Sequence, residues 1–354
     1  MGYPTTGRTG QRRVAGGHRP PGAQRSEDYA EPPREVRPVS PTLSDVKIHE
    51  RTILNGRVVI VTGAGRGIGR AEALECGRQG AAVVVSDLDE AVATEVVDQI
   101  RSEGGRAVAS VGDVSDTMVA DALVTRAVAE FGQLDALVNN AGFVSDRTVA
   151  KMSDDEWDSV LRVHLRGHFT CTRAACRYWK ESERTGRLVH TTSASGILGN
   201  FGQSNYGTAK AGIAAFSTIV AMEMARYQVT SNAIAPSAIT RLTEDLLPDE
   251  EMREHERAAE EHGFDFFAPE NIAPLVAYLC SADSGHISGK VFGVQGDSIE
   301  LYQPFTSVAE ITAGNRRWRP SELDGRIDDL FSDACVQAGP ENMMARMRYG
   351  ILST

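Results

Sequence analysis

The sequence lacks any run of about eighteen apolar residues, the length that a membrane-spanning helix needs. Positive charge is in deficit: 37 Lys and Arg stand against 48 Asp and Glu, and the formal net charge of −11 argues against nucleic acid as a partner. Cysteine is scarce, with five residues and no pair at the spacing of metal ligands or of a redox centre. We therefore expect no metal, no membrane partner and a reducing, cytoplasmic location.

Large apolar side chains are rare in residues 1–50, which are rich in Gly, Pro, Arg, Ser and Thr. Such a segment cannot bury enough surface to offset the entropy lost on ordering, so we predict a disordered tail. Strand-type and helix-type segments fill residues 51–299, and we expect a single domain there. Residues 300–354 form a C-terminal extension, whose pattern predicts a strand over 307–312 and a helix over 321–331.

One stretch near the middle of the chain carries the clearest chemistry. An apolar strand-type run over residues 188–192 leads into Ser193, and a helical segment follows over residues 203–227. Tyr206 and Lys210 stand four apart and so share one face of that helix. A hydroxyl, a phenol and an ammonium are thus expected near the carboxyl end of a strand, where open α/β sheets bind ligands.

These groups suit acid–base chemistry at an alcohol or a ketone. A phenol has an unperturbed pKa near ~10, and a nearby cation lowers it, so Lys210 is expected to bring the pKa of Tyr206 closer to working pH. Tyr206 could then exchange a proton with the substrate oxygen, which Ser193 would hold by a hydrogen bond, with Ser195 also contacting the substrate. A bare Tyr-x-x-x-Lys arises often by chance, but the serine thirteen residues earlier, after a strand, favours the functional interpretation.

A glycine-rich loop follows the strand-type run over residues 57–61 and leads into a helical segment over residues 70–79. Strand, glycine loop and helix are the context of a dinucleotide-binding fingerprint. One glycine allows the tight turn, the next lets the backbone approach a pyrophosphate, and the last lets the helix pack on the strand. The helix N-terminus then faces the phosphates. The residues expected to contact the cofactor here are Gly63, Arg66, Gly67, Ile68 and Gly69.

The second strand-type run ends at Asp87, about twenty residues after the glycine loop. An acid at this point suits the ribose hydroxyls of NAD and repels the 2′-phosphate of NADP. Arg66 argues the other way, since an arginine in the loop could meet a phosphate. We weigh Asp87 more heavily and predict NAD. Asp87 could instead, or also, cap the helix that begins near Glu90.

Two later strand ends offer further contacts to the cofactor. After the third strand-type run, Asp113 could reach the adenine amino group, or could cap the helix over residues 115–131. After the fourth, Asn140 can pin the backbone of neighbouring strands, and two small residues follow it. The residues expected to contact the cofactor at these two ends are Asp113, Val114, Asn140, Ala141 and Gly142.

The order and spacing of these pieces resemble the classical short-chain dehydrogenase/reductase family. The matching residues are 62–69, 139–142, Ser193, Tyr206, Lys210, Pro236 and Thr240. The resemblance implies an α/β, doubly wound (Rossmann) fold with seven parallel strands, hydride transfer at C4 of the nicotinamide, and Tyr206 as the acid and base. It also implies that Lys210 binds the nicotinamide ribose and that Ile239 and Thr240 contact the cofactor.

One position departs from that family. In the helix after residues 139–142 the family usually carries an asparagine that serves a proton relay, and this chain carries His164. Three interpretations stay open: His164 carries protons itself, its backbone carbonyl holds a relay water, or it is a packed interior histidine.

Four further segments resemble the (3R)-hydroxyacyl-CoA dehydrogenase domains of peroxisomal multifunctional enzymes of type 2. They are residues 146–147, 157–169, 193–203 and 235–243. This resemblance implies a 3-hydroxyacyl thioester as substrate. The acidic stretch over residues 236–269, with its apolar Phe264, Phe266 and Phe267, favours instead a bulky apolar alcohol such as a steroid. A sensor or scaffold protein that binds NAD without turnover is the alternative outside the enzymes.

A long helix is predicted from Met152 to Glu181, opened by a capping box of Ser153 and Glu156. In the family this helix and the helix of Tyr206 pair across a dimer. The resemblance therefore implies a homodimer or a homotetramer.

Overall fold

The computed structural model describes residues 52–240, 257, 259–261, 263–303 and 305–332. The predicted disordered tail and the acidic residues of 241–256 lie outside the described residues. The chain forms two compact units, and the described residues divide between them at residue 311.

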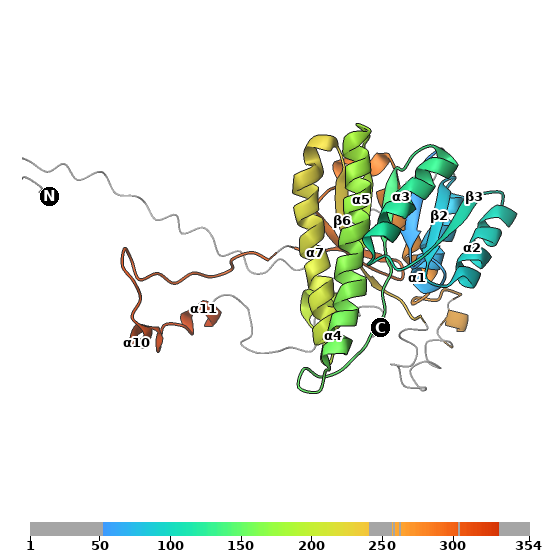
Figure 1. The fold of residues 1–354 in the computed structure, drawn as a ribbon. Coiled ribbons are helices and arrows are strands. Elements are labelled where there is room, and N and C mark those ends of the chain that lie inside the picture. Colours follow the sequence, from blue (N-terminus) through green and yellow to red (C-terminus); the bar gives the residue numbers. More distant parts are fainter. Residues whose placement is uncertain (1–51, 241–256, 258, 262, 304, 333–354) are drawn as a thin grey trace, which may run out of the picture. The chain divides into compact units, whose positions relative to one another are not determined.

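An eight-stranded sheet forms the centre of the first unit, in the order β3-β2-β1-β4-β5-β6-β7-β8 (Figure 1). Strands β1 to β7 run parallel, which confirms the predicted doubly wound α/β fold. The central strands are buried on both faces, as parallel strands between two helical layers must be, and their Val-rich sequences suit that burial. The seven parallel strands are β1 (Val58–Thr62), β2 (Ala82–Asp87), β3 (Arg106–Val111), β4 (Ala136–Asn139), β5 (Arg187–Thr191), β6 (Thr230–Ser237) and β7 (Val291–Gln295).

The eighth strand, β8 (Ser298–Leu301), pairs antiparallel with β7 at the edge of the sheet. Sequence analysis missed it and placed the end of the domain inside it, at residue 299. Only Gly296 and Asp297 join the two strands, and Gly296 has φ +51°, which suits a tight hairpin turn. Four residues are too few to show a strand periodicity, so the hairpin had no clear signal.

Helices cover both faces of the sheet. One layer consists of α1 (Gly67–Arg78), α2 (Glu90–Ser102) and α9 (Ala273–Cys280), and the other of α3 (Thr117–Phe131), α5 (Gly167–Glu181) and α7 (Ser204–Met224) (Figure 1). Successive side chains of a strand point to opposite faces of the sheet. In β5, Val189 belongs to the core on the side of α1 and α9, and Leu188 belongs to the core on the side of α5 and α7.

The long helix predicted from Met152 to Glu181 is interrupted in the structure. It consists of α4 (Asp154–Leu161), a π-helical turn η2 (Arg162–Arg166), and α5. The predicted capping box is confirmed, because the Ser153 hydroxyl accepts from the Glu156 backbone and the Glu156 carboxylate accepts from that of Ser153. π-turns occur often at functional sites, and this one carries His164.

The second unit contains two short helices, α10 (Pro320–Leu323) and α11 (Asp329–Ser332). The single helix predicted over 321–331 is wrong, because the chain turns between them at Gly325, which has φ +77°. The strand predicted over 307–312 is also wrong, since these residues pair with no strand among the described ones.

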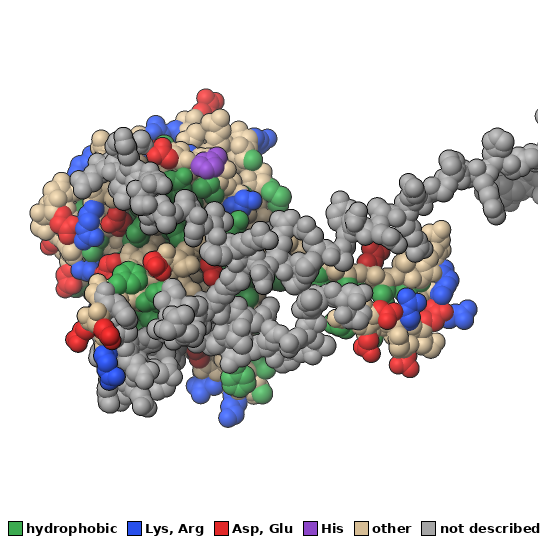
Figure 2. Space-filling model, turned by 180° about the vertical axis from the view of Figure 1, so that it is seen from behind, with side chains coloured by type: hydrophobic (Ala, Val, Ile, Leu, Met, Phe, Trp, Pro, Cys, Tyr) green, Lys and Arg blue, Asp and Glu red, His purple; other side chains and the backbone are tan. Residues whose placement is uncertain are grey.

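Seen from the side opposite to Figure 1, acidic, basic and apolar side chains are interspersed over the described surface (Figure 2). Within the described ranges, no helix combines the length and the hydrophobicity that crossing a membrane requires.

Candidate active site

The predicted site residues converge at the carboxyl ends of β1, β2, β4, β5 and β6. The glycine loop follows β1, Asn140 follows β4, and Ser193 lies two residues beyond β5. In the loop, Gly63 has φ +63° and Gly67 has φ +53°, conformations that side chains rarely adopt. The sheet therefore gathers segments that lie more than a hundred residues apart in the sequence.

The glycine loop has no space for side chains. A Cβ atom at Gly69 would lie 2.2 Å from the carbonyl oxygen of Gly63, and one at Gly63 would lie 2.7 Å from the Cα atom of Ala141. Helix α1 begins at Gly67, and its N-cap residue, Arg66, makes no side-chain capping bond. An uncapped helix N-terminus beside bare backbone fits the pyrophosphate of a dinucleotide. Thr240 packs against the glycine loop. A Cβ atom at Gly67 would lie 3.3 Å from the Cγ2 atom of Thr240.

Asp87 supports the glycine loop from the end of β2. Its Oδ2 accepts a hydrogen bond from the backbone of Gly65 at 2.9 Å, and its Oδ1 accepts one from Asp89 at 3.2 Å. The N-cap of α2 is Asp89, so the capping role considered for Asp87 is wrong. Arg66, which could have favoured a phosphate, forms an ion pair of 3.4 Å with Asp89.

Asp113 is not the N-cap of α3, so the capping role considered for it is also wrong. The N-cap of α3 is Asp116, and Asp113 accepts from the backbone of Ser115 at 2.9 Å and forms an ion pair with Arg162. The side chain of Val114 is buried in the core beneath α3 and α5, so only its backbone can face a cofactor.

Asn140 pins the strand ends together as predicted. Its amide donates to the carbonyl oxygens of Thr62 and Gly63, both at 3.2 Å, and its backbone N–H donates to the Thr62 hydroxyl at 3.0 Å. The backbone of Ala141 shares the same hydroxyl at 3.2 Å. These bonds fix β4 against β1 beside the glycine loop.

Ser193, Tyr206 and Lys210 meet at the start of α7. Ser193 caps the short helix α6 (Ala194–Leu198) by accepting from the backbone of Ser195, and its hydroxyl lies close enough to the Tyr206 phenol to lower the pKa of that group. The Lys210 Nζ atom lies 5.4 Å from the centre of the Tyr206 ring and donates to the carbonyl oxygen of Thr191 at 2.6 Å. The three groups that sequence analysis grouped together therefore lie close to one another.

Sequence analysis missed Asn205, which fixes the start of α7. It is fully buried, its Oδ1 accepts from the backbone of Tyr206 at 2.7 Å, and its amide donates to the carbonyls of Ser145 and Glu156 at 2.9 and 3.0 Å. The only sequence signal was its place beside the tyrosine.

Comparison with known proteins identifies the family. A family model described as short chain dehydrogenase matches residues 57–251. The chain belongs to this family.

Several relatives are similar over most of the chain. A hydroxyacyl-CoA dehydrogenase, ChsB1, of Mycobacterium tuberculosis is 41% identical over 79% of this chain and 90% of its own length. The mouse peroxisomal multifunctional enzyme type 2 is 42% identical over 68% of this chain, which spans 32% of that longer protein. A crystal structure of a short chain dehydrogenase from Mycobacterium avium superimposes with a TM-score of 0.71 at 42% identity, covering 82% of this chain and 98% of that one. Both resemblances predicted from the sequence are thus confirmed.

In this short chain dehydrogenase, burial has the largest effect on the pKa values of Tyr206 and Lys210. It raises the pKa of Tyr206, a hydrogen bond from Ser193 lowers it, and the charge of Asp146 raises it further, with a raised pKa as the result. Burial also lowers the pKa of Lys210 to about 7, against the charge of Glu72. The predicted lowering of the Tyr206 pKa by Lys210 is therefore not found in the protein alone.

His164, where the family usually has asparagine, lies against Tyr206. The two rings meet edge to face with centroids 5.2 Å apart. Burial and the charge of Lys210 lower the pKa of His164 to about 3, so the imidazole is neutral. Its Nε2 lies 2.6 Å from the carbonyl oxygen of Phe143 and 3.0 Å from the backbone nitrogen of the same residue, and its Nδ1 is buried without a partner among the described residues. Nε2 can therefore donate to the carbonyl or accept from the N–H, and the tautomer decides which ring nitrogen carries the proton.

The backbone carbonyl of His164 is already engaged. It accepts from Nδ1 of His168 at 2.7 Å, and the His168 ring stacks on that of His190 at 5.7 Å. A relay water on this carbonyl, one of the three interpretations, would have to share it with His168. Gly142 makes room for the His164 ring, since a Cβ there would lie 2.0 Å from its Cε1.

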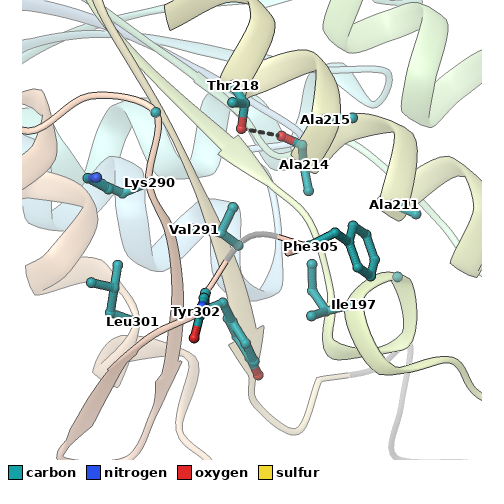
Figure 3. Close-up of a pocket in the computed structure, with 13 residues that line it drawn as sticks. Ile197, Ala211, Ala214, Ala215, Thr218, Lys290, Val291, Leu301, Tyr302 and Phe305 are labelled. Atoms are coloured by element: carbon teal, nitrogen blue, oxygen red, sulfur yellow. Dashed lines mark hydrogen bonds between the residues drawn. The ribbon is translucent and has the colours of Figure 1, made fainter. Parts of the chain in front are cut away.

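One cavity of about 380 Å³ lies between α6, α7, β7 and the end of β8 (Figure 3). Its walls are mostly apolar, among them Ile197, Val291 and Phe305, and include none of Ser193, Tyr206 and Lys210. This cavity therefore does not enclose the three candidate groups.

Proposed function

We propose that this protein is an NAD-dependent oxidoreductase that interconverts a secondary alcohol and its ketone, with a 3-hydroxyacyl thioester as the favoured substrate. The proximity of Ser193, Tyr206 and Lys210 at the carboxyl end of β5 carries this proposal. An intact acid–base set of this kind argues against the alternative of a sensor or scaffold that binds NAD without turnover.

NAD, when bound, would supply the hydride acceptor at C4 of its nicotinamide. The glycine loop and Asp87 would hold its pyrophosphate and adenine ribose, and Lys210 with Thr240 would hold the nicotinamide end. During oxidation, the Tyr206 oxygen takes the proton of the substrate hydroxyl while Ser193 holds the substrate oxygen. The pKa of Tyr206 is raised in the protein alone, where Lys210 is already present, so the positive charge of the bound cofactor would have to favour the phenolate as well.

We propose that His164 is a positioning residue for Tyr206. The two rings meet edge to face, and the backbone of Phe143 holds Nε2 of the imidazole. Burial and the charge of Lys210 lower the pKa of His164 to about 3, so the imidazole stays neutral while Tyr206 exchanges its proton with the substrate.

The relatives favour an acyl thioester over a steroid. Two of them are a hydroxyacyl-CoA dehydrogenase and a peroxisomal multifunctional enzyme, and the first is similar over 90% of its own length. Near the site, Phe266 packs on the β7–β8 turn and meets Phe267 edge to face at 5.0 Å. These rings supply an apolar wall that suits an acyl chain or a bulky apolar alcohol.

A panel of three alcohols tests the proposal: a 3-hydroxyacyl-CoA, a hydroxysteroid and a simple secondary alcohol, each with NAD and with NADP. We expect NADH absorbance to rise fastest with the CoA ester and NAD. Turnover of the steroid alone would keep the mechanism and discard the thioester. Absence of turnover with all three alcohols, although NADH binds, would favour the sensor.

Asp87 should set the preference for NAD. Replacing Asp87 by serine removes its charge and the acceptor of the Gly65 N–H, so we expect the ratio of kcat/KM for NAD to that for NADP to fall about a hundredfold. The matched control is Asp98→Asn, which removes an exposed charge of the same sign from the surface of α2. A ratio unchanged in the Asp87 variant would contradict the assignment of this acid to the ribose.

A further inference from the structure

The side chain of Asn205 joins the candidate acid–base residue to two other parts of the chain. It is fully buried at the second position of α7, directly before Tyr206. Its Oδ1 accepts from the backbone N–H of Tyr206 at 2.7 Å. Its amide donates to the carbonyl oxygens of Ser145 and Glu156, at 2.9 and 3.0 Å. Both amide hydrogens and the acceptor oxygen are therefore engaged, and every partner is a backbone group.

The first turn of α7 has no conventional N-cap. Gln203 stands at the N-cap position and makes no side-chain capping bond. Its side-chain amide donates instead to Asp146 at 2.8 Å and accepts from Asn200 at 3.0 Å. The first N–H groups of a helix have no partner within the helix, so other groups have to satisfy them. Asn205 does so for Tyr206, and the same bond fixes the backbone of that tyrosine.

Both carbonyl partners of Asn205 belong to the segment between β4 and α5. Ser145 lies in the loop after β4, where the backbone of Phe143 binds the His164 imidazole. Glu156 lies in the first turn of α4, which packs on α7 (Figure 1). Asn205 thus fixes the tyrosine backbone relative to the loop that holds His164, whose ring packs on the phenol.

Lys210, one turn further along α7, is anchored by other bonds. Its Nζ donates to the carbonyl oxygen of Thr191 at 2.6 Å, and its own carbonyl oxygen accepts from the Thr192 hydroxyl at 2.6 Å. The end of β5 therefore holds the lysine, whereas Asn205 holds the tyrosine. Loss of the Asn205 amide should disturb the two residues unequally.

We propose that Asn205 is a positioning residue that sets the place of the Tyr206 phenol through the tyrosine backbone. This inference rests on the proposed function, because it concerns the group that exchanges the substrate proton. A side-chain amide suits the task, since it carries no charge and its donors and acceptor have fixed directions. Misplacing a reacting group by about 1 Å can cost a factor of about a hundred in rate, so a bond that fixes this backbone bears on kcat.

The test compares Asn205→Ala with Asn232→Ala in steady-state kinetics, NADH titration and thermal unfolding. Asn232 is a matched control, because it is buried at 1% exposure and also binds only backbone groups. Its amide donates to the carbonyl oxygen of Ile287 at 2.9 Å, and its oxygen accepts from the Lys290 N–H at 3.1 Å. It lies toward the amino end of β6, away from the strand ends that carry the site.

Asn205→Ala removes the acceptor of the Tyr206 N–H, so we expect kcat to fall about a hundredfold. KM and the affinity for NADH should stay near the wild-type values, because Lys210 keeps its anchors at the end of β5. Asn232→Ala should lower the melting temperature and leave kcat unchanged. A lower melting temperature with a wild-type kcat in the Asn205 variant would reduce its amide to a structural bond and overturn the proposal.

Asn205→Asp gives a second variant in case the alanine variant does not fold, and it adds a pH profile. The new carboxyl group keeps an acceptor for the Tyr206 N–H and, when protonated, donates to one of the two carbonyls. Its ionised form would face both carbonyl oxygens in a buried place. We therefore expect the ratio of the variant kcat to the wild-type kcat to fall as the pH rises and the carboxyl group ionises. A ratio that stays constant with pH would contradict the positioning role.

A spectroscopic measurement distinguishes failure of this proposal from failure of the proposed function, because it needs no substrate. In protein with tyrosine isotope-labelled at Cζ, the Tyr206 signal is the one that Tyr206→Phe removes. The His164 ring lies edge to face against this phenol, so a displaced phenol should give a shifted signal in Asn205→Ala. Asn232→Ala should leave the signal in place. An unmoved signal in both variants would sink the proposal even if the thioester panel succeeds, and a shift confined to the Asn205 variant would support it even if the panel fails.

Discussion

Replacing Tyr206 by phenylalanine is expected to lower kcat about a thousandfold while leaving NADH affinity near the wild-type value. The variant keeps the ring that packs on His164 and removes the oxygen that exchanges the substrate proton. General acid–base catalysis by one positioned group contributes about a hundredfold to ten-thousandfold, so a loss of this size is the signature of that role. The measurement is steady-state kinetics with the best substrate of the panel, combined with NADH titration.

The matched control is Tyr227→Phe, in the 3-10 turn that follows α7, which should keep full activity. His164→Phe should fall between the two, because it removes the imidazole that packs on Tyr206 and keeps the acid–base group. Full turnover by Tyr206→Phe would remove the mechanism, whatever the substrate. Loss of NADH binding in the same variant would show that the tyrosine holds the cofactor and would leave its role as an acid unproven.

The fold and the cofactor loop could be predicted from the sequence because their signals are local. Gly63, Gly67 and Gly69 indicate a backbone with no space for side chains. The structure shows the reason at Gly69, where a Cβ atom would lie 2.2 Å from the carbonyl oxygen of Gly63. The capping box at Ser153 is likewise a pattern four residues long. Such features need no knowledge of what lies across the sheet.

Features decided by contacts between layers could not be predicted. Nothing around Asn205 in the sequence shows that its amide would bind the carbonyls of Ser145 and Glu156. Glu72 looked like an ordinary helix residue, because only the packing of α1 against α9 and the sheet shows that it is fully buried.

The protonation states were beyond sequence analysis for the same reason. A lysine four residues from a tyrosine predicts a lowered phenol pKa, but burial reverses the sign in the protein alone and lowers the pKa of the lysine as well. The prediction treated charge and ignored desolvation, and desolvation is the larger effect for groups this deeply buried.

Replacing Lys210 by methionine is expected to lower kcat/KM about a hundredfold and to weaken NADH binding. The variant removes a cation that is buried at 2% exposure between Tyr206 and the carbonyl of Thr191. Both consequences follow from one lost charge, which would bind the nicotinamide ribose and favour the phenolate. Steady-state kinetics and NADH titration measure the two separately, with Lys180→Met, an exposed lysine of α5, as the control.

The same substitution should make the cofactor-free protein more resistant to acid. Folding lowers the pKa of Lys210 from 10.5 to about 7, so the unfolded chain binds this proton more tightly, and stability is lost as the pH falls from 10.5 through 7. Lys210→Met removes that loss, which amounts to at most about 5 kcal/mol at pH 6. It also removes the hydrogen bond to the carbonyl of Thr191, which contributes about 1 kcal/mol. Urea unfolding at pH 6 and at pH 10 should therefore show a higher free energy of unfolding for the variant at the lower pH only.

Equal effects of the substitution at both pH values would contradict this prediction. They would mean that burial of the Lys210 ammonium has no net cost, because its neighbours, Glu72 among them, compensate that burial completely. The predicted opposition between stability and activity at one residue is what a buried catalytic ammonium requires: the charge that serves the reaction is the charge that the fold resists.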